Sequence, residues 1–193
     1  MRKILFLTLL LSIVACKSRK TGDASEKYQL ENLATVISKG DLQKAFPDAR
    51  IAEGVDLFEE GTVEMAYSVL YPETKDELLV LWKDKDRKKV YQIYCENDGR
   101  WTSKEGIKIG STSYDDLLAL NNGPIDVYGF GWDYSGAVDW KDGKLAKSNI
   151  RVFLEPVNAP PQSFYGDHIL DSKLVEEIRN LDLRVRAIVY QGE

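Results

Sequence analysis

The chain has 193 residues and carries 31 acidic against 26 basic side chains, a formal net charge of −5. An acidic body is a poor partner for nucleic acid, because that binding depends on neutralising phosphates with lysine and arginine. With one histidine and two cysteines, the chain shows no ligand spacing for zinc and no calcium loop, so we expect no metal and no cofactor.

The first sixteen residues read as a secretory signal. Two basic residues precede an apolar run over residues 4–14, which suits a signal-peptide core. The run is shorter than the roughly 20 residues that a membrane-spanning helix needs. It closes in the tetrapeptide IVAC at Cys16, which resembles the lipobox of bacterial lipoproteins. The resemblance implies cleavage after residue 15 and acylation of Cys16.

An acylated Cys16 would anchor the protein in a membrane of the bacterial cell envelope, because each buried methylene of its acyl chains contributes about 0.8 kcal/mol to membrane binding. The polypeptide itself would not cross that membrane. In the lipoproteins that it resembles, an aspartate after this cysteine often retains the protein at the inner membrane. Lys17 stands there instead, which favours the outer membrane. The alternative is an ordinary secretory signal, residues 1–15, followed by a chance cysteine.

Residues 16–27 then comprise the lipidated cysteine and a flexible tether. The tether, KSRKTGDASEK, has almost no apolar side chain and could span roughly 36 Å when stretched. We expect one compact body over 28–193, long enough to form its own core. Once Cys16 is acylated, Cys95 is the only thiol and cannot form an internal disulfide, so we expect it to be a small buried residue.

Three short helices are predicted, each opened by a capping side chain and closed by proline, asparagine or glycine. They are SKGDLQKAFPDA from Ser38, STSYDDLLALNNGP capped by Thr112 or Ser113, and KLVEEIRN capped by Asp171 or Ser172.

Strands are predicted where apolar and β-branched residues run between turn signals. They cover residues 62–72, 77–83, 89–95, 125–134, 137–141, 144–154 and 183–190. Ser135-Gly136 and Asp142-Gly143 are two-residue hairpin signals, so the latter half reads as an antiparallel meander. The predicted fold class is therefore α+β, an antiparallel sheet with three short helices.

The first two helix segments align at an offset of 75 residues, which predicts two related helix-then-sheet units, 28–105 and 106–193. The matches are Ser38 with Ser113, Asp41 with Asp116 and Leu42 with Leu117. The spacing GIKIGSTSYDDLLALNNGP also resembles the opening of tandem modules in bacterial envelope lipoproteins and in the β-lactamase-inhibitor-protein-like fold. In this chain the Gly-Pro stop is contiguous and the helix is about a residue longer. The resemblance implies modules that bind or brace other proteins.

An aromatic ladder stands out in the second half, with large rings at every second position. Its members are Tyr128, Phe130, Trp132 and Tyr134. Alternate positions share one face of a strand. Either the ladder forms the core under the helices, or it is an exposed platform for sugar rings or a partner's side chains. A two-residue turn at Ser135-Gly136 would place Trp140 opposite Gly131.

Two further candidates lie nearer the C-terminus. The loop EPVNAPPQSFYGD, residues 155–167, carries Phe164 and Tyr165; loops of this length often bind ligands, but this one could equally be a crossover with its aromatics packed down. His168 is the only histidine. No nucleophile elbow accompanies it, and its neighbour Asp167 would point away from the ring.

We therefore expect a protein that is not an enzyme. The leading prediction is a membrane-anchored envelope lipoprotein that binds or inhibits another protein, most simply one of the envelope. The alternative is glycan or peptidoglycan binding through the aromatic ladder, and a hydrolase built on His168 ranks third. The candidate ligand-binding residues are Tyr128, Phe130, Trp132, Tyr134, Phe164 and Tyr165, with Cys16 as the lipidation site.

Overall fold

The computed structural model describes residues 26–37, 42–171 and 174–192. In chain order, the elements of these residues are η1 (Glu26–Tyr28), α1 (Leu30–Ile37), α2 (Leu42–Ala45), β1 (Ile51–Phe58), β2 (Val63–Leu70), β3 (Leu78–Trp82), β4 (Val90–Cys95), α3 (Tyr114–Asn121), β5 (Asp126–Val127), β6 (Val138–Asp139), η2 (Lys144–Lys147), β7 (Ile150–Pro156), η3 (Gln162–Phe164), α4 (Val175–Asn180) and β8 (Leu183–Gln191). The label η marks a short 3-10 helix.

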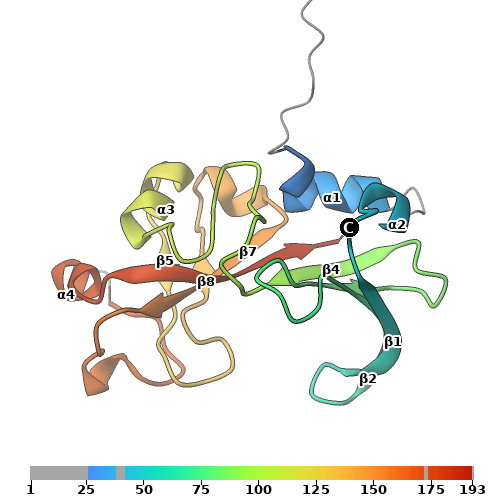
Figure 1. Ribbon diagram of the computed structural model, residues 1–193. Coiled ribbons are helices and arrows are strands. Elements are labelled where there is room, and N and C mark those ends of the chain that lie inside the picture. The colour runs from blue at the N-terminus through green and yellow to red at the C-terminus, as the bar shows by residue number, and fades with distance from the viewer. Residues whose placement is uncertain (1–25, 38–41, 172–173, 193) are drawn as a thin grey trace, which may run out of the picture.

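One antiparallel sheet organises the body, with the strand order β1-β2-β3-β4-β8-β7, and β5 and β6 form a separate pair. This confirms the predicted α+β class. Helices α1, α2 and α3 cover one face of the sheet (Figure 1). The β1–β2 hairpin curls toward the other side, where η3 and the loop after β5 also lie.

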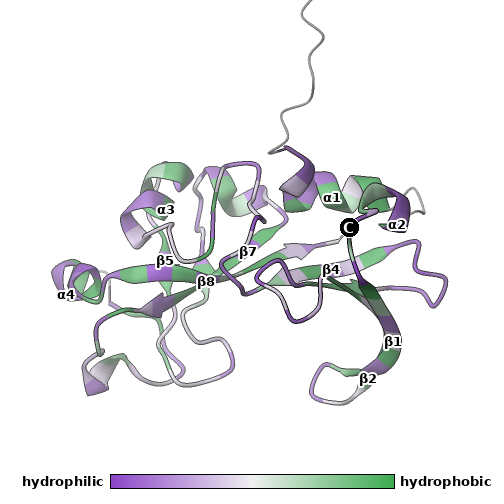
Figure 2. Cartoon of the chain, viewed as in Figure 1, coloured by the Kyte–Doolittle hydropathy of each residue, from purple (hydrophilic) through white to green (hydrophobic). Residues whose placement is uncertain are grey.

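The core fills the space between the helices and the sheet. Helix α1 buries Leu30, Leu33, Ala34 and Ile37, which recur at the spacing of one helical face. Strands β3 and β4 supply Val80 and Ile93 from below. Figure 2 shows hydrophobic residues concentrated along the strands and mixed with hydrophilic ones on the helices, as expected for helices with one face in water.

Helix α3 is confirmed with both of its predicted ends. Ser113 and Asp116 form a reciprocal capping box, and Asn122 closes the helix in the left-handed conformation, with φ of 50°. Helix α2 begins at Leu42, and the predicted start at Ser38 lies outside the described residues, as does Ser172 before α4.

Two elements were missed. Helix α1 has the apolar spacing of a helix, but its sequence offers no strong cap to mark its start. Strand β1 has the sequence IAEGVDLF, in which two acidic residues and a glycine interrupt the apolar pattern. Among the described residues it is an edge strand with a neighbour on one side, so it needs fewer apolar side chains than a central strand.

The antiparallel meander predicted for the latter half forms only in part: β5 pairs with β6 and β7 with β8, but the two pairs belong to different sheets. β8 lies between β4 and β7, with Cys95 opposite Ile188 and Val152 opposite Ile188 on the other side. β8 is therefore a central strand with a neighbour along each edge, whereas a meander would leave it at the edge of the sheet. The pairing of β4 with β8 also joins strands from both expected units into one sheet. Whether those units are related remains a prediction.

The segment around Tyr28 is fixed to the rest of the body. Tyr28 accepts a backbone hydrogen bond from Thr102 at 3.1 Å, and Leu30 donates to Thr102 at 3.0 Å. The guanidinium of Arg100 lies 4.9 Å from the ring of Tyr28 and 4.8 Å from the ring of Tyr71, and it pairs with Asp76. A cation between two rings gains from both.

The ion pair between Arg100 and Asp76 makes the stability of the fold depend on pH. The hydrogen bond from Arg100 lowers the pKa of the Asp76 carboxyl below its usual value. A depressed pKa contributes stability that is present above the unfolded-state pKa of about 3.9 and is lost as the pH falls through the folded-state pKa.

We therefore expect the free energy of unfolding to decrease as the pH is lowered from about 5 to about 3, and Asp76→Asn to remove part of that decrease. Urea unfolding across this range, in both proteins, measures it. Parallel pH profiles in the two proteins would show that the ion pair contributes nothing.

Candidate functional site

The two aromatic segments predicted separately, 128–134 and the end of loop 155–167, lie side by side. The backbone N–H of Phe130 donates to Phe164 at 2.8 Å, and Gly166 donates back to Phe130 at 2.9 Å. Gly129 donates to the carbonyl of His168 at 2.8 Å. These bonds bring together, on the side of the sheet away from α1, rings that lie more than thirty residues apart in the sequence.

The ladder is not a strand. β5 ends at Val127, which pairs with Val138, so residues 128–137 form a loop rather than two strands joined by a two-residue turn. The reason is Gly129: a Cβ there would stand 2.5 Å from the carbonyl oxygen of Gly166. The missing side chain lets the backbone of residues 164–168 pass beside Gly129, and from Phe130 onward the chain bonds to this segment, whereas Tyr128 still donates to Ala137 at 2.9 Å.

The predicted partner of Gly131 was also wrong. Trp140 is buried elsewhere and donates its indole N–H to the carbonyl of Ile150 at 2.9 Å. The ring of Tyr165 lies over Gly131 instead, 3.0 Å from the position that a Cβ would take. The second expected hairpin, at Asp142-Gly143, leads into η2 rather than a strand.

The aromatic candidates divide between core and surface. Phe130 and Phe164 are buried and form the floor of the region. Tyr128 and Trp132 are half-buried above them, while Tyr134 is 59% exposed. The ladder is therefore part core and part exposed surface, so each of the two predicted alternatives holds for some of its residues.

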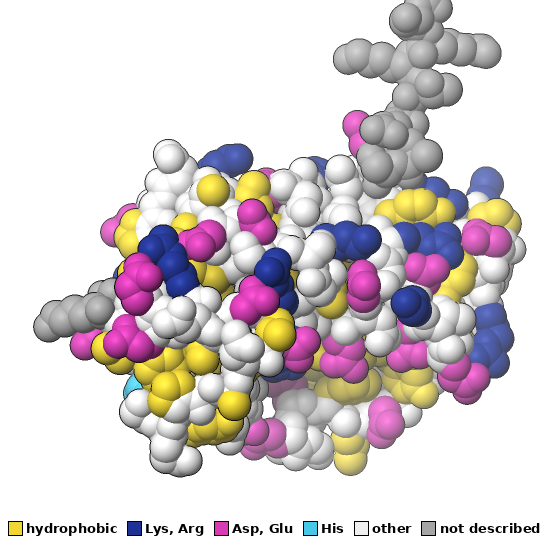
Figure 3. Space-filling model, turned by 60° about the vertical axis from the view of Figure 1, so that its left-hand side comes forward, with side chains coloured by type: hydrophobic (Ala, Val, Ile, Leu, Met, Phe, Trp, Pro, Cys, Tyr) yellow, Lys and Arg dark blue, Asp and Glu magenta, His cyan; other side chains and the backbone are white. Residues whose placement is uncertain are grey.

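We call the exposed part the aromatic surface, comprising Tyr128, Trp132, Tyr134, Tyr165 and Ile169. The ring centroids of Trp132 lie 6.1 Å from Tyr128 and 5.3 Å from Tyr134. The indole N–H of Trp132 donates to Gly129 at 2.9 Å, which orients the ring. Tyr165 is 45% and Ile169 43% exposed. Figure 3 shows hydrophobic side chains gathered beside the one histidine in this part of the molecule.

A polar hollow of about 380 Å³ adjoins this surface and shares Tyr128 with it. Asp139, Ser148 and Arg151 also line the hollow. Lys141, at its rim, bonds to Asp126 at 2.7 Å, which raises the pKa of Lys141. Nothing in the sequence marks Ser148 and Arg151 as site residues. They lie in a stretch predicted to be one strand, and the structure divides that stretch between η2 and β7, which place both residues at the hollow.

His168 is exposed, and its Nε2 lies 3.1 Å from the carbonyl oxygen of Ser163. Within the described ranges, no hydrogen bond joins its ring to a hydroxyl or a carboxylate. Cys95 is buried, as predicted, and burial raises the pKa of its thiol to about 12. No group of three metal-binding side chains occurs in the part of the chain that the structure describes.

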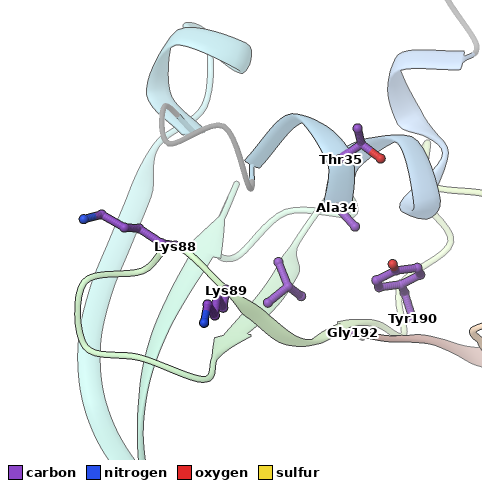
Figure 4. A pocket seen from close by; sticks show the side chains of 7 residues that line it. Ala34, Thr35, Lys88, Lys89, Tyr190 and Gly192 are labelled. Atoms are coloured by element: carbon purple, nitrogen blue, oxygen red, sulfur yellow. The ribbon is translucent and has the colours of Figure 1, made fainter.

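A second hollow, of about 320 Å³, lies between α1 and the end of β8. Ala34, Val90 and Tyr190 form its apolar wall. The side chains of Lys88 and Lys89 point away from Tyr190 in different directions (Figure 4), so their charges do not converge on one ligand.

Trp132 provides a direct optical test of the aromatic surface. The other three tryptophans, Trp82, Trp101 and Trp140, are all buried. We expect acrylamide to quench a component of the fluorescence that comes from Trp132, and Trp132→Phe to remove that component. Equal quenching of the two proteins would place Trp132 out of reach of solvent.

No family model matches the chain, and no curated protein matches it. Among solved structures, the chain is similar to the uncharacterized protein yfeY from Escherichia coli, with 12% identity over 80% of this chain and 91% of that chain and a TM-score of 0.46. Among the described residues, no helix is long and apolar enough to cross a membrane.

Proposed function

We propose that the protein is a lipid-anchored binding protein of the bacterial cell envelope, held by an acylated Cys16, which contacts another protein through the aromatic surface. The observation that carries the proposal is the convergence of two distant segments on one exposed apolar patch. Three of its side chains are each more than two fifths exposed. Contiguous patches of this kind usually mark interaction sites.

The position of η1 supports this. η1 (Glu26–Tyr28) lies on the helix-covered side of the sheet, and the aromatic surface lies on the other side (Figure 1). A tether attached at Glu26 would leave the aromatic surface free to meet a partner away from the attachment side.

The ring geometry favours a protein over a sugar. Trp132 is tilted by 58° to Tyr128 and by 59° to Tyr134. A flat sugar ring gains most from a face that is open and level, whereas a stepped surface that includes Ile169 can accept branched and aromatic side chains. Exposed aromatic residues contribute strongly at the centres of protein interfaces.

Cross-linking on intact cells tests the proposal. It should recover one neighbour in stoichiometric amount, and Cys16→Ala should move the protein into the aqueous fraction. Recovery of bulk lipid and abundant porins alone would overturn the binding function, and an unchanged membrane fraction for Cys16→Ala would overturn the anchor.

Glycan binding is the second candidate, favoured by the polar hollow beside Tyr128. A sugar stacked on that ring would place its hydroxyls near Asp139, Ser148 and Arg151. In that case a peptidoglycan-derived oligosaccharide should protect Trp132 from acrylamide. Unchanged quenching at saturating oligosaccharide would remove this candidate and leave the protein partner.

A further inference from the structure

Strand β1 is an open sheet edge, unlike the edge at the other end of the sheet. At β7, the backbone N–H of Leu154 donates to Gly136 at 2.8 Å, and the carbonyl of Ile150 accepts from Trp140. The chain thus covers β7 with its own loop. Among the residues that the structure describes, β1 has β2 on one side and no strand on the other.

The pairing with β2 determines which groups of β1 face outward. Tyr71 donates to the carbonyl of Arg50 at 2.9 Å, which makes residue 50 an inward-facing position. Because inward and outward positions alternate in an antiparallel pair, residues 52, 54, 56 and 58 face β2, and residues 51, 53, 55 and 57 face outward.

The outward row is open at its centre. The N–H of Leu57 is occupied by the neighbouring carboxylate of Asp56 at 2.8 Å, and Arg87 donates to Gly54, which belongs to the inward row. Among the described residues, no hydrogen bond reaches the N–H groups of Glu53 and Val55. These donors and the carbonyls beside them can pair with an added strand.

β1 is curved, but its pairing with β2 is unbroken from Ile51 to Phe58. The ring of Tyr67 lies across Gly54, where a Cβ would stand 2.5 Å from the phenolic oxygen, and it packs edge-on against Phe58 at 6.1 Å. Val55 is 49% and Leu57 59% exposed. β1 contains neither lysine nor proline, the residues that commonly protect edges.

The acidic charge of the β1–β2 hairpin favours a basic segment as the added strand at the β1 edge. Residues 50–64 contain five acidic side chains and one basic one. Glu53 and Glu64 are matched by Arg87 and Lys85, but within the described ranges Asp56, Glu59 and Glu60 have no ion pair. A second copy of the chain would bring an equally acidic edge.

We propose that the β1 edge accepts an extended segment of another protein, in which lysine or arginine alternates with apolar residues, as a seventh strand. Backbone pairing with Glu53 and Val55 holds the segment, and its cations meet Asp56 and the acidic tip of the hairpin. This site is separate from the aromatic surface and goes beyond the proposed function.

The test uses the full-length protein in detergent and a fluorescent ten-residue peptide of alternating lysine and valine, followed by anisotropy. Val55→Pro removes an outward N–H without touching the pairing to β2, whereas Val55→Ala removes the same side chain and keeps the N–H. We expect binding to Val55→Ala at near wild-type strength and at least tenfold weaker binding to Val55→Pro. A glutamate–valine peptide should not bind.

A second variant guards against misfolding of Val55→Pro. Asp56→Lys combined with Glu60→Lys should weaken the lysine–valine peptide tenfold and allow the glutamate–valine peptide to bind. Equal binding of the lysine–valine peptide to all variants would overturn the proposal. So would a dimer in sedimentation that Val55→Pro dissociates, because a second copy would then be the occupant. Tyr134→Ala should leave peptide binding unchanged, which separates this site from the aromatic surface.

Discussion

Asn121→Asp is expected to lower the free energy of unfolding by about 3 kcal/mol or more, although the two side chains have the same shape. Asn121 is fully buried. Its amide nitrogen donates to the carbonyls of Pro124 and Trp140, each at 3.0 Å, and its oxygen accepts from Leu145 at 3.0 Å. Aspartate would place an oxygen, and a buried charge, against two carbonyl oxygens.

Asn122→Asp is the matched control, because Asn122 is the next residue, exposed, and in a left-handed conformation that aspartate also adopts. We expect it to cost less than about 1 kcal/mol. Urea unfolding of the three proteins measures both changes. Equal midpoints for the two variants would show that the amide of Asn121 does not hold α3, β6 and η2 together.

Tyr165→Ala is expected to reduce capture of the protein partner tenfold or more, about 1.4–2 kcal/mol in binding free energy. The ring of Tyr165 lies on Gly131 and connects the two segments of the aromatic surface, while almost half of it is open to contact. The fold should survive, because backbone hydrogen bonds between Phe130 and residues 164 and 166 also join the two segments.

The control is Val36→Ala, which removes an exposed apolar side chain from α1 on the other side of the sheet. It should leave capture unchanged. Phe164→Ala is unsuitable, because Phe164 is buried and its loss would cost about 3–5 kcal/mol of stability. Equal capture by wild type and Tyr165→Ala would contradict a role for the aromatic surface.

Helices and strands were predictable where the residues that define them lie within the element itself or directly beside it. Helix α3 carries its own cap in Ser113 and Asp116 and its own stop at Asn122. Strands β2, β3 and β4 alternate or run apolar between clear turns. Strand β1 was not predictable in this way, because an edge strand needs no continuous apolar face and its sequence resembles a loop.

The sequence indicates which residues are candidates for the site, but it does not indicate how they are arranged. The sequence pattern places Phe130 and Trp132 on one face, yet the structure buries the first and leaves the second at the surface. The difference comes from residues 164–168, which pass beside Gly129. No local pattern around residue 130 contains that contact, because it depends on a segment more than thirty residues away.

A photo-cross-linking amino acid placed at position 134, compared with the same group at position 36, tests the central claim most directly. In intact cells, position 134 should yield one discrete adduct with another envelope protein, and position 36, on the helix-covered side, should not. The same adduct from both positions, or none from position 134, would contradict a binding face formed by the aromatic surface.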